Sequence, residues 1–134
     1  MITTDLKIAE YLSTMRDIEL YIVGGRVRTG FFSLGDTMAS DSLKQFTASK
    51  GFMSCDAISL AAGVTNTSMF EVAVKRRIIE QSAEVFMMVD SSKLETTAPY
   101  AVSSLSVIGH LVTDQEADTM LLEKYAKCGM RILK

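Results

Sequence analysis

The sequence predicts an α/β fold, an open and mainly parallel sheet with helices on both faces. Apolar runs typical of buried strands alternate at least four times with segments of helical periodicity. No hairpin signal lies between the strands, and parallel strands need crossover connections that are usually helical. The chain has no internal repeat or linker-like tract, and its 134 residues suffice for one hydrophobic core. We therefore expect residues 1–134 to form a single domain.

The first half of the chain contains two segments of helical periodicity. Asp5 suits the N-cap of the first segment, because Leu6, Ala9 and Leu12 recur at helical spacing up to Ser13. In order, we expect the tail of a strand at 1–4, the helix after Asp5, a strand at 18–23 ended by glycines, a loop at 26–34, a helix from Gly35 onward, and a strand at 51–60 that runs into a loop.

The second half is expected to add two helices and three strands. Ser68 and Glu71 form the Ser-x-x-Glu pattern of a capping box, which satisfies free N–H groups at a helix start. Asp114 can cap a later helix, and Gly129 suits the position just after its end. In order, we expect a helix from Ser68, a strand at 84–89, a strand at 107–113, a helix at 115–128 and a last strand at 130–133.

Composition limits the partners of this domain. The net charge of −2 means that the chain lacks the excess of positive charge that nucleic-acid-binding domains use to contact phosphates. Cys55 and Cys128 lack metal-ligand spacing and do not make a disulfide framework. No apolar run is long enough to cross a bilayer, and the first residues do not resemble a signal peptide. We expect a cytoplasmic domain with no membrane partner, no metal and no cofactor.

A candidate ligand site follows the strand at 84–89. Asp90 ends this strand and Lys93 lies on the short polar loop after it. In α/β folds, ligands bind outside the carboxyl ends of the strands, where a lysine can hold a phosphate and an aspartate can accept from a sugar hydroxyl. The alternative is that Asp90 caps the following turn and Lys93 is solvated.

Glu71 and Lys75 form a second candidate pair. They stand four residues apart on the predicted helix, so their side chains share one face. The pair could support the helix alone, with Glu71 in the capping box, or it could contact a ligand. A capping role does not exclude ligand contact.

Two weaker candidates lie nearer the amino terminus. The glycine pair Gly24-Gly25 is followed by cations that include Arg28, an arrangement suited to an anion but also to an ordinary turn. Thr3 and Thr4 precede the first helix, where hydroxyl and N–H groups could hold a phosphate or merely cap the helix.

Catalytic constellations are absent from the sequence pattern. His110 lies in an apolar run without a nearby Cys or carboxylate partner, and we predict it to be a core residue. No Ser-His-Asp set, zinc cluster or P-loop is present.

The stretch FEVAVKRRIIEQSAEVFMMVDSSK resembles the sugar-responsive effector domain of DeoR-type transcriptional repressors. These domains read E-x-x-x-K-R-x-x-I, then an apolar strand, then D-x-S-K. The matching positions here are Glu71, Lys75, Arg76, Ile79, Asp90, Ser92 and Lys93. The resemblance extends to the glycine pair at 24–25, to Gly35 and to Val112-Thr113-Asp114, so it spans nearly the whole chain.

The resemblance implies a ribose-5-phosphate isomerase-like fold and an effector pocket lined by Glu71 and Lys75. Two departures are visible. Ser54 and Ala57 occupy positions where the family usually has glycine, so close backbone approach to a ligand is less favoured there. The family chain also begins with a helix-turn-helix domain and a strand with an Asp-x-Gly-Thr-Thr phosphate loop, whereas this sequence starts at the equivalent of the second strand.

These departures lead to three expectations. Specific DNA binding is expected only through the helix-turn-helix domain that these residues do not include. An open flank of the sheet is expected to favour self-association into a homo-oligomer. Without the phosphate loop, sugar phosphates are expected to bind weakly or not at all.

The predicted function is that of a sensor domain of a DeoR-family regulator that binds a phosphorylated sugar or a related metabolite. The alternative is an aldose–ketose isomerase with Glu71 or Asp90 as general base, although neither has an acidic partner cluster. A third hypothesis is a structural remnant that only oligomerises.

Overall fold

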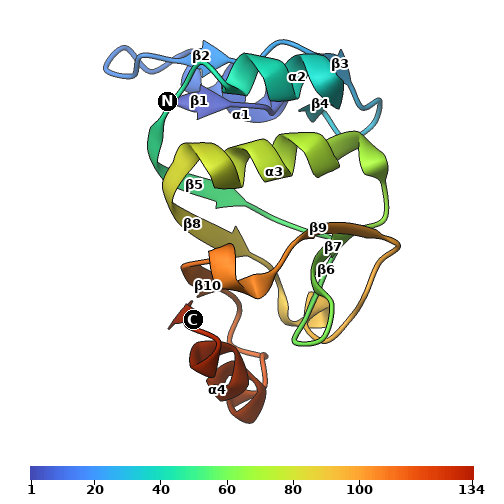
Figure 1. Ribbon diagram of the computed structural model, residues 1–134. Coiled ribbons are helices and arrows are strands. Elements are labelled where there is room, and N and C mark those ends of the chain that lie inside the picture. Colours follow the sequence, from blue (N-terminus) through green and yellow to red (C-terminus); the bar gives the residue numbers. More distant parts are fainter.

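A parallel sheet of four strands forms the centre of the molecule. The computed structural model describes all 134 residues (Figure 1). The strand order is β11-β10-β8-β5, and every neighbouring pair is parallel. The strands are β5 (Ala48–Met53), β8 (Ser82–Met88), β10 (His110–Val112) and β11 (Arg131–Leu133). The prediction of an α/β fold with a mainly parallel sheet is confirmed.

Three smaller sheets surround the central one. β1 (Ile2–Thr3) pairs in parallel with β2 (Tyr21–Ile22), and β3 (Arg26–Val27) pairs antiparallel with β4 (Leu34–Gly35). The third sheet is antiparallel and contains β6 (Ala57–Ser59), β7 (Gly63–Asn66) and β9 (Tyr100–Ser103). The segment 26–34, expected to be a loop, thus forms the β3–β4 hairpin, and a second hairpin joins β6 to β7 although the sequence has no hairpin signal. The β6–β7 turn lacks the Asn-Gly or Asp-Gly dipeptide that signals hairpins in sequences.

Four α-helices connect the strands. They are α1 (Leu6–Leu12), α2 (Asp36–Leu43), α3 (Val72–Gln81) and α4 (Thr119–Lys127), with short 3-10 turns η1 (Met69–Glu71), η2 (Ser91–Lys93) and η3 (Leu105–Val107). The predicted cap of α1 is confirmed, because the Asp5 carboxylate accepts from the N–H groups of Lys7 and Ile8. No helix combines the length and apolar composition that a membrane-spanning segment needs.

Two helix starts differ from the prediction. The last helix begins at Thr119 with Asp118 as its N-cap, so Asp114 does not cap it. The capping box is also not formed. Ser68 accepts from the N–H of Phe70, whereas the carboxylate of Glu71 points to other partners described below. The sequence pattern identified both acidic residues but assigned each to the wrong local partner.

The main core lies on one side of the central sheet. It contains 17 buried residues, contributed by α3, α4, the sheet strands and the β6–β7–β9 sheet. Ile58, Met87, Leu111 and Tyr125 have no exposed surface. The Tyr125 hydroxyl donates to Glu95 at 2.6 Å and lies 3.1 Å from the Ile58 carbonyl oxygen, which ties α4 to the antiparallel sheet.

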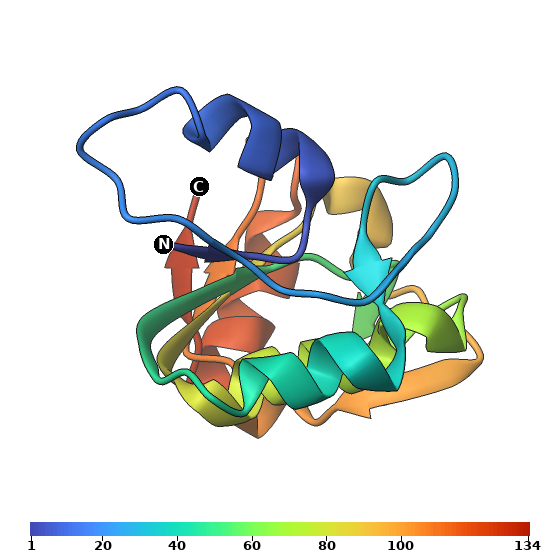
Figure 2. The ribbon, with the colours of Figure 1, turned by 90° about the horizontal axis from the view of Figure 1, so that it is seen from above.

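A second, much smaller core lies beside α2. Its four buried residues are Val23, Ala39, Leu43 and Val74. Figure 2 shows α2 and α3 side by side, with α1 on the far side of the β1–β2 pair. The amino-terminal elements therefore attach to the rest of the fold mainly through α2, and β1 does not pair with the central sheet.

Candidate functional site

The loop after β8 places Asp90 and Lys93 beside each other. The Asp90 carboxylate accepts from the N–H and the hydroxyl of Ser92, so Asp90 does cap the following turn. The Lys93 ammonium lies 3.7 Å from the Asp90 carboxylate and 3.5 Å from the Ser54 hydroxyl. The capping alternative is thus correct for Asp90, while Lys93 stays within reach of a ligand.

Asp114 holds this loop from the neighbouring strand. One of its carboxylate oxygens accepts from the Ser91 N–H at 2.7 Å, and the other accepts from the Glu116 N–H at 2.9 Å. These hydrogen bonds, above all that from Ser91, hold the pKa of Asp114 below its ordinary value. The carboxyl end of β10 is thereby attached to the loop that follows β8.

A cleft opens at this edge of the sheet. It has a volume of about 460 Å³, and its lining comes from the carboxyl ends of the neighbouring strands β5, β8 and β10. The polar residues in the lining are Ser54, Asp90, Lys93, Thr113 and Asp114. The hydroxyl of Thr113 is buried and has no hydrogen-bond partner. This is the position at which α/β sheets bind ligands.

The Asp114 hydrogen bonds predict an acid-dependent loss of stability. A lowered pKa means that the carboxylate stabilises the fold fully above its ordinary pKa of 3.8, and that this contribution disappears as the pH falls through the lowered value. Asp114→Asn should therefore lose less stability than the parent between about pH 5 and about pH 2 in urea unfolding experiments. Equal losses in the two proteins would contradict the role assigned to Asp114.

Glu71 is the centre of a second polar cluster. Its carboxylate accepts from the Ser33 hydroxyl and lies 3.3 Å from the Lys75 ammonium and 3.7 Å from the Arg28 guanidinium. The Lys75 ammonium also donates to the Asn66 side-chain oxygen at 3.1 Å. The side chains of Glu71 and Lys75 are only 15% and 13% exposed, so this is a largely buried ion pair.

The two clusters meet at the segment between β5 and β6. Ser54 contacts Lys93, and Asp56 accepts from the N–H and hydroxyl of Thr67, next to Asn66. Burial raises the pKa of the Cys55 thiol to about 11, and the nearby ammonium groups of Lys75 and Lys93 oppose this rise. The charges of both lysines, one from each cluster, therefore act on the Cys55 thiol.

Other predicted residues lie elsewhere. Thr3 accepts from the Asp5 N–H at 3.1 Å, and the Thr4 carbonyl oxygen accepts from the Leu34 N–H at 2.7 Å. Both threonines line a different, larger cleft, and neither lines the cleft that contains Lys93. The backbone nevertheless links Thr4 to the Glu71 cluster, because Leu34 directly follows Ser33, whose hydroxyl donates to Glu71.

The glycine pair has a packing reason of its own. A Cβ atom on Gly25 would lie 2.8 Å from both the Ala39 Cβ atom and the Gly35 carbonyl oxygen. Gly25 thus allows α2 to approach the turn between β2 and β3, while a Cβ atom on Gly24 would meet only the Ser42 Oγ atom, at 4.0 Å. Ligand contact by Gly24, Gly25, Thr3, Thr4 and the residues of both clusters stays a prediction.

Sequence reasoning missed several residues of these clusters. Ser33 and Asn66 join Glu71 and Lys75 through the tertiary fold, and no local pattern marks them. Asn66 is completely buried, and its amide nitrogen has no partner. Asp114 could have been found from the strand alternation, because it follows β10 as Asp90 follows β8.

His110 also differs from the prediction. Its Nε2 atom lies 2.9 Å from the Glu84 carboxylate, and its ring stacks on Phe86 with centroids 4.0 Å apart. The expected absence of a carboxylate partner is wrong. Pairing of β8 with β10 brings the two residues together, although 26 positions separate them in the sequence.

The chain belongs to the DeoR C-terminal sensor domain family, whose sequence profile matches residues 1–115. This agrees with the α/β fold.

Individual relatives are transcriptional regulators. The chain is 40% identical over 132 residues to a protein named as a transcriptional regulator of the sgc region in Escherichia coli K12, covering 98% of the chain and 51% of that protein. It is 27% identical over 133 residues to the HTH-type transcriptional repressor GlcR of Bacillus subtilis 168, covering 99% and 51%. It is also 27% identical over 114 residues to the glycerol-3-phosphate regulon repressor of Escherichia coli K12, covering 85% and 45%. The chain thus spans about half the length of these curated relatives.

Proposed function

We propose that this domain binds a phosphorylated sugar or a related anionic metabolite at the Lys93 cleft and that it regulates transcription in response. The observation that carries the proposal is the cleft itself, which is lined by a loosely paired lysine and by Thr113, whose hydroxyl is buried and has no partner. A buried polar atom normally has a hydrogen-bond partner, so the Thr113 hydroxyl suggests that a ligand supplies one.

The chemistry of the cleft suits a polyol phosphate. An ammonium group at the end of a flexible side chain is a compact charge for a phosphate oxygen, and Lys93 is held only by contacts of 3.5 Å and 3.7 Å. The carboxylates of Asp90 and Asp114 can accept from sugar hydroxyls in addition to their present bonds. The name of the glycerol-3-phosphate regulon repressor points to the same class of ligand.

We propose that the site has two sides, the Lys93 cleft and the Glu71 cluster, and that the Glu71 cluster positions the second side. Lys75 is already bonded to Glu71 and Asn66, so it is less available to a phosphate than Lys93. The Asn66 amide nitrogen lacks a partner and could donate to a ligand oxygen. The segment Ser54–Asp56 would transmit changes between the two clusters, because Ser54 contacts Lys93 and Asp56 accepts from Thr67, the neighbour of Asn66 in the chain.

The isomerase alternative gains no specific support. A general base must reach the proton that it removes, and it must be free to accept that proton. The Glu71 carboxylate is surrounded by Ser33, Lys75 and Arg28, and Asp90 caps a turn. The matched relatives are named as regulators, which favours sensing over turnover.

The proposed sensing acts by linkage. A ligand changes DNA binding only if it binds two states of the regulator with different affinities. The loop after β8 is a suitable element for this change, because its hydrogen bond to Asp114 can be kept or broken as the cleft fills. In this proposal, DNA is contacted by a separate domain of the regulator, and subunits associate as a homo-oligomer.

The test is a thermal-shift screen with sugar phosphates, glycerol 3-phosphate and inorganic phosphate. A ligand that binds only the native state at about a hundred times its Kd adds about 2.7 kcal/mol of stability. Lys93→Ala should weaken binding roughly tenfold or more, since hydrogen bonds to charged groups contribute about 1.5–3 kcal/mol. The melting temperature without ligand should stay nearly unchanged because Lys93 is partly exposed.

Lys127→Ala is the matched control, because Lys127 is an exposed lysine of α4 outside the cleft. It should respond to ligand as the parent does. If Lys93→Ala shows the same ligand response as the parent, the anion is held elsewhere and the proposed site is wrong.

A further inference from the structure

The loop that carries Lys93 continues into a residue with an unusual backbone conformation. Glu95 has φ +56°, in the left-handed region that favours glycine. This conformation is unfavourable for a residue with a Cβ atom, and it persists only where surrounding contacts hold it. Residues of this kind are often found at ligand-binding elements. Glu95 lies two positions after the lysine of the proposed site, so the contacts that hold it bear on that site.

Two hydrogen bonds from distant segments hold Glu95. One of its carboxylate oxygens accepts from the Tyr125 hydroxyl at 2.6 Å and from the Leu60 N–H at 3.0 Å. Tyr125 belongs to α4 and has no exposed surface, whereas Leu60 directly follows β6. Burial and the hydrogen bond to Glu95 raise the pKa of the Tyr125 hydroxyl, so this group stays a protonated donor at neutral pH. We call the contacts of Glu95 with Tyr125 and Leu60 the Glu95 latch.

The latch lies at the carboxyl-terminal end of the Lys93 loop. The other end of the loop is fixed by the hydrogen bond to Asp114. Leu94, between the lysine and the latch, is buried in the main core. Thr96 directly follows Glu95, and its hydroxyl donates to the Lys93 carbonyl oxygen at 2.8 Å. A backbone rotation at Glu95 would therefore redirect the residue that holds the Lys93 carbonyl group.

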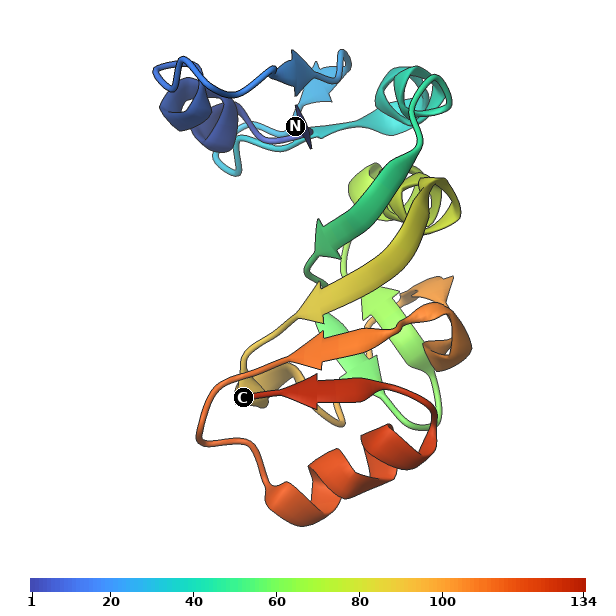
Figure 3. The same ribbon diagram turned by 90° about the vertical axis from the view of Figure 1, so that its left-hand side faces the viewer.

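α4 connects the latch to a distant part of the molecule. Figure 3 shows this helix next to β11, at the opposite end of the molecule from the amino-terminal elements. α4 begins at Thr119, so it lies outside the residues 1–115 that the family profile matches. The contact between α4 and the Lys93 loop is thus a feature of this chain that membership of the family does not by itself imply.

We propose that Glu95 is a positioning residue for the effector and that, held by Tyr125 of α4, it keeps the Lys93 loop in the conformation that binds the anionic group. This inference rests on the proposed function, because it concerns how the Lys93 cleft is prepared for its ligand. Ordering a flexible segment on binding costs affinity, so a loop that is already ordered binds more tightly. The Lys93 ammonium itself has only loose contacts, of 3.5 Å and 3.7 Å, and the order comes from the backbone around it.

The first measurement needs no ligand. Tyr125→Phe keeps the buried ring and removes only the hydroxyl that donates to Glu95. The N–H groups of Lys93 and Leu94 are both hydrogen-bonded within the loop, and amide hydrogen exchange reports how often they open. We expect these two amides to exchange roughly tenfold faster in Tyr125→Phe than in the parent, while the amides of β8 change little.

Two substitutions separate the side chain of Glu95 from its backbone. Glu95→Gln keeps an acceptor oxygen and removes the charge, whereas Glu95→Gly suits φ +56° and has no acceptor. Binding of glycerol 3-phosphate and of inorganic phosphate is measured by isothermal titration calorimetry. We expect the Kd to rise roughly fivefold or more in Glu95→Gly and Tyr125→Phe, and to stay within about a factor of two of the parent in Glu95→Gln. Since Glu95→Gly relieves backbone strain, its lower affinity would not follow from a less stable fold.

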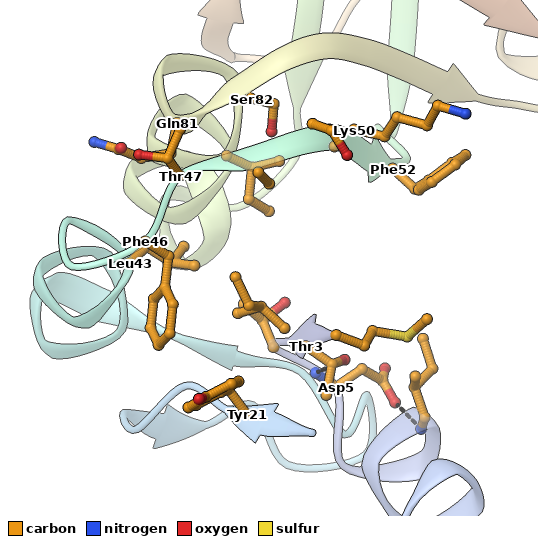
Figure 4. A pocket seen from close by; sticks show the side chains of 18 residues that line it. Thr3, Asp5, Tyr21, Leu43, Phe46, Thr47, Lys50, Phe52, Gln81 and Ser82 are labelled. Atoms are coloured by element: carbon orange, nitrogen blue, oxygen red, sulfur yellow. Dashed lines mark hydrogen bonds between the residues drawn. The ribbon is translucent and has the colours of Figure 1, made fainter. Parts of the chain in front are cut away.

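A double-mutant cycle with Lys93→Ala tests whether Glu95 acts through the lysine. Adding Glu95→Gly to Lys93→Ala should not raise the Kd further, because the ammonium that the latch positions is then absent. Lys50→Ala is the control for an anion that binds elsewhere. Figure 4 shows Lys50 at the larger cleft, of about 600 Å³, which Lys93 does not line. This variant should bind both probes as the parent does.

The proposed site and the latch can fail separately. If neither probe binds the parent, or if Lys93→Ala binds as the parent does, the proposed site is wrong and the role of the latch in binding is lost with it. If Lys93→Ala binds more weakly, an unchanged Kd or an unchanged amide exchange in Tyr125→Phe and Glu95→Gly would refute the latch alone. The positioning role is also refuted if Glu95→Gln is as weak as Glu95→Gly, or if Glu95→Gly has the same effect with and without Lys93.

Discussion

Glu71→Ala is expected to lower the free energy of unfolding by about 2–4 kcal/mol, because it leaves buried positive charge without its partner. Lys75 and Arg28 both lie within 4 Å of the Glu71 carboxylate, and the Lys75 side chain is only 13% exposed. The same change should remove the response to sugar phosphates if this cluster positions one wall of the site. Urea unfolding and thermal shifts with ligand measure the two effects separately.

Glu80→Ala is the matched control for this prediction. Glu80 lies on α3, the helix that follows Glu71, and pairs with Arg77, but its side chain is 55% exposed. Its replacement should cost no more than about 1 kcal/mol, as is usual for surface ion pairs. If Glu71→Ala is equally mild, the Glu71 cluster is a solvated face and not a buried network.

A double variant separates the structural role of the pair from ligand binding. Glu71→Leu combined with Lys75→Met replaces both charges by apolar side chains, which is often neutral or stabilising for buried ion pairs. We expect this variant to be more stable than Glu71→Ala and still unresponsive to ligand. A double variant that regains the ligand response would assign binding to the Lys93 loop alone.

Gly63→Ala is expected to destabilise the domain by about 3 kcal/mol or more, since steric overlap and backbone strain act together. Gly63 has φ +72° at the start of β7. A Cβ atom there would lie 2.4 Å from the Ser103 carbonyl oxygen and 3.2 Å from the Ser104 Cα atom. These are backbone atoms of the loop end of β9, so they cannot move aside without disturbing the β7–β9 pairing.

Gly30→Ala provides the control for backbone strain. Gly30 has φ +85°, but nothing lies within 4 Å of an added Cβ atom. This variant should lose only about 1–2 kcal/mol, the cost of a left-handed backbone for an ordinary residue. Chemical denaturation of the two variants measures the difference, and equal losses would show that overlap with Ser103 is unimportant.

Local patterns alone were sufficient for much of the fold. Helical spacing and the Asp5 cap predicted α1, and apolar runs predicted β8, β10 and β11 of the central sheet. The strand predicted at 51–60 is instead the end of β5 (Ala48–Met53) followed by β6 (Ala57–Ser59) of another sheet. Gly129, with φ +97°, follows α4 as expected for a residue just past a helix end. The Asp90–Lys93 pair was also recognisable, because both residues lie on one short loop. Such features depend on residues within a few positions of each other, so the sequence determines them directly.

Features that join distant segments required the tertiary structure. Glu71 forms the expected pattern with Ser68, yet its carboxylate bonds to Ser33, 38 positions away. Asp114 was predicted to cap a helix, but it accepts a hydrogen bond from the Ser91 N–H in the loop after the neighbouring strand β8. In both cases a local hydrogen bond competes with a long-range one, and only strand order decides which partner is near. The order of the strands also leaves one edge of β1 and one edge of β5 without a partner. The sequence of a single strand does not show whether a second strand pairs with its other edge, so only the tertiary structure reveals these open edges.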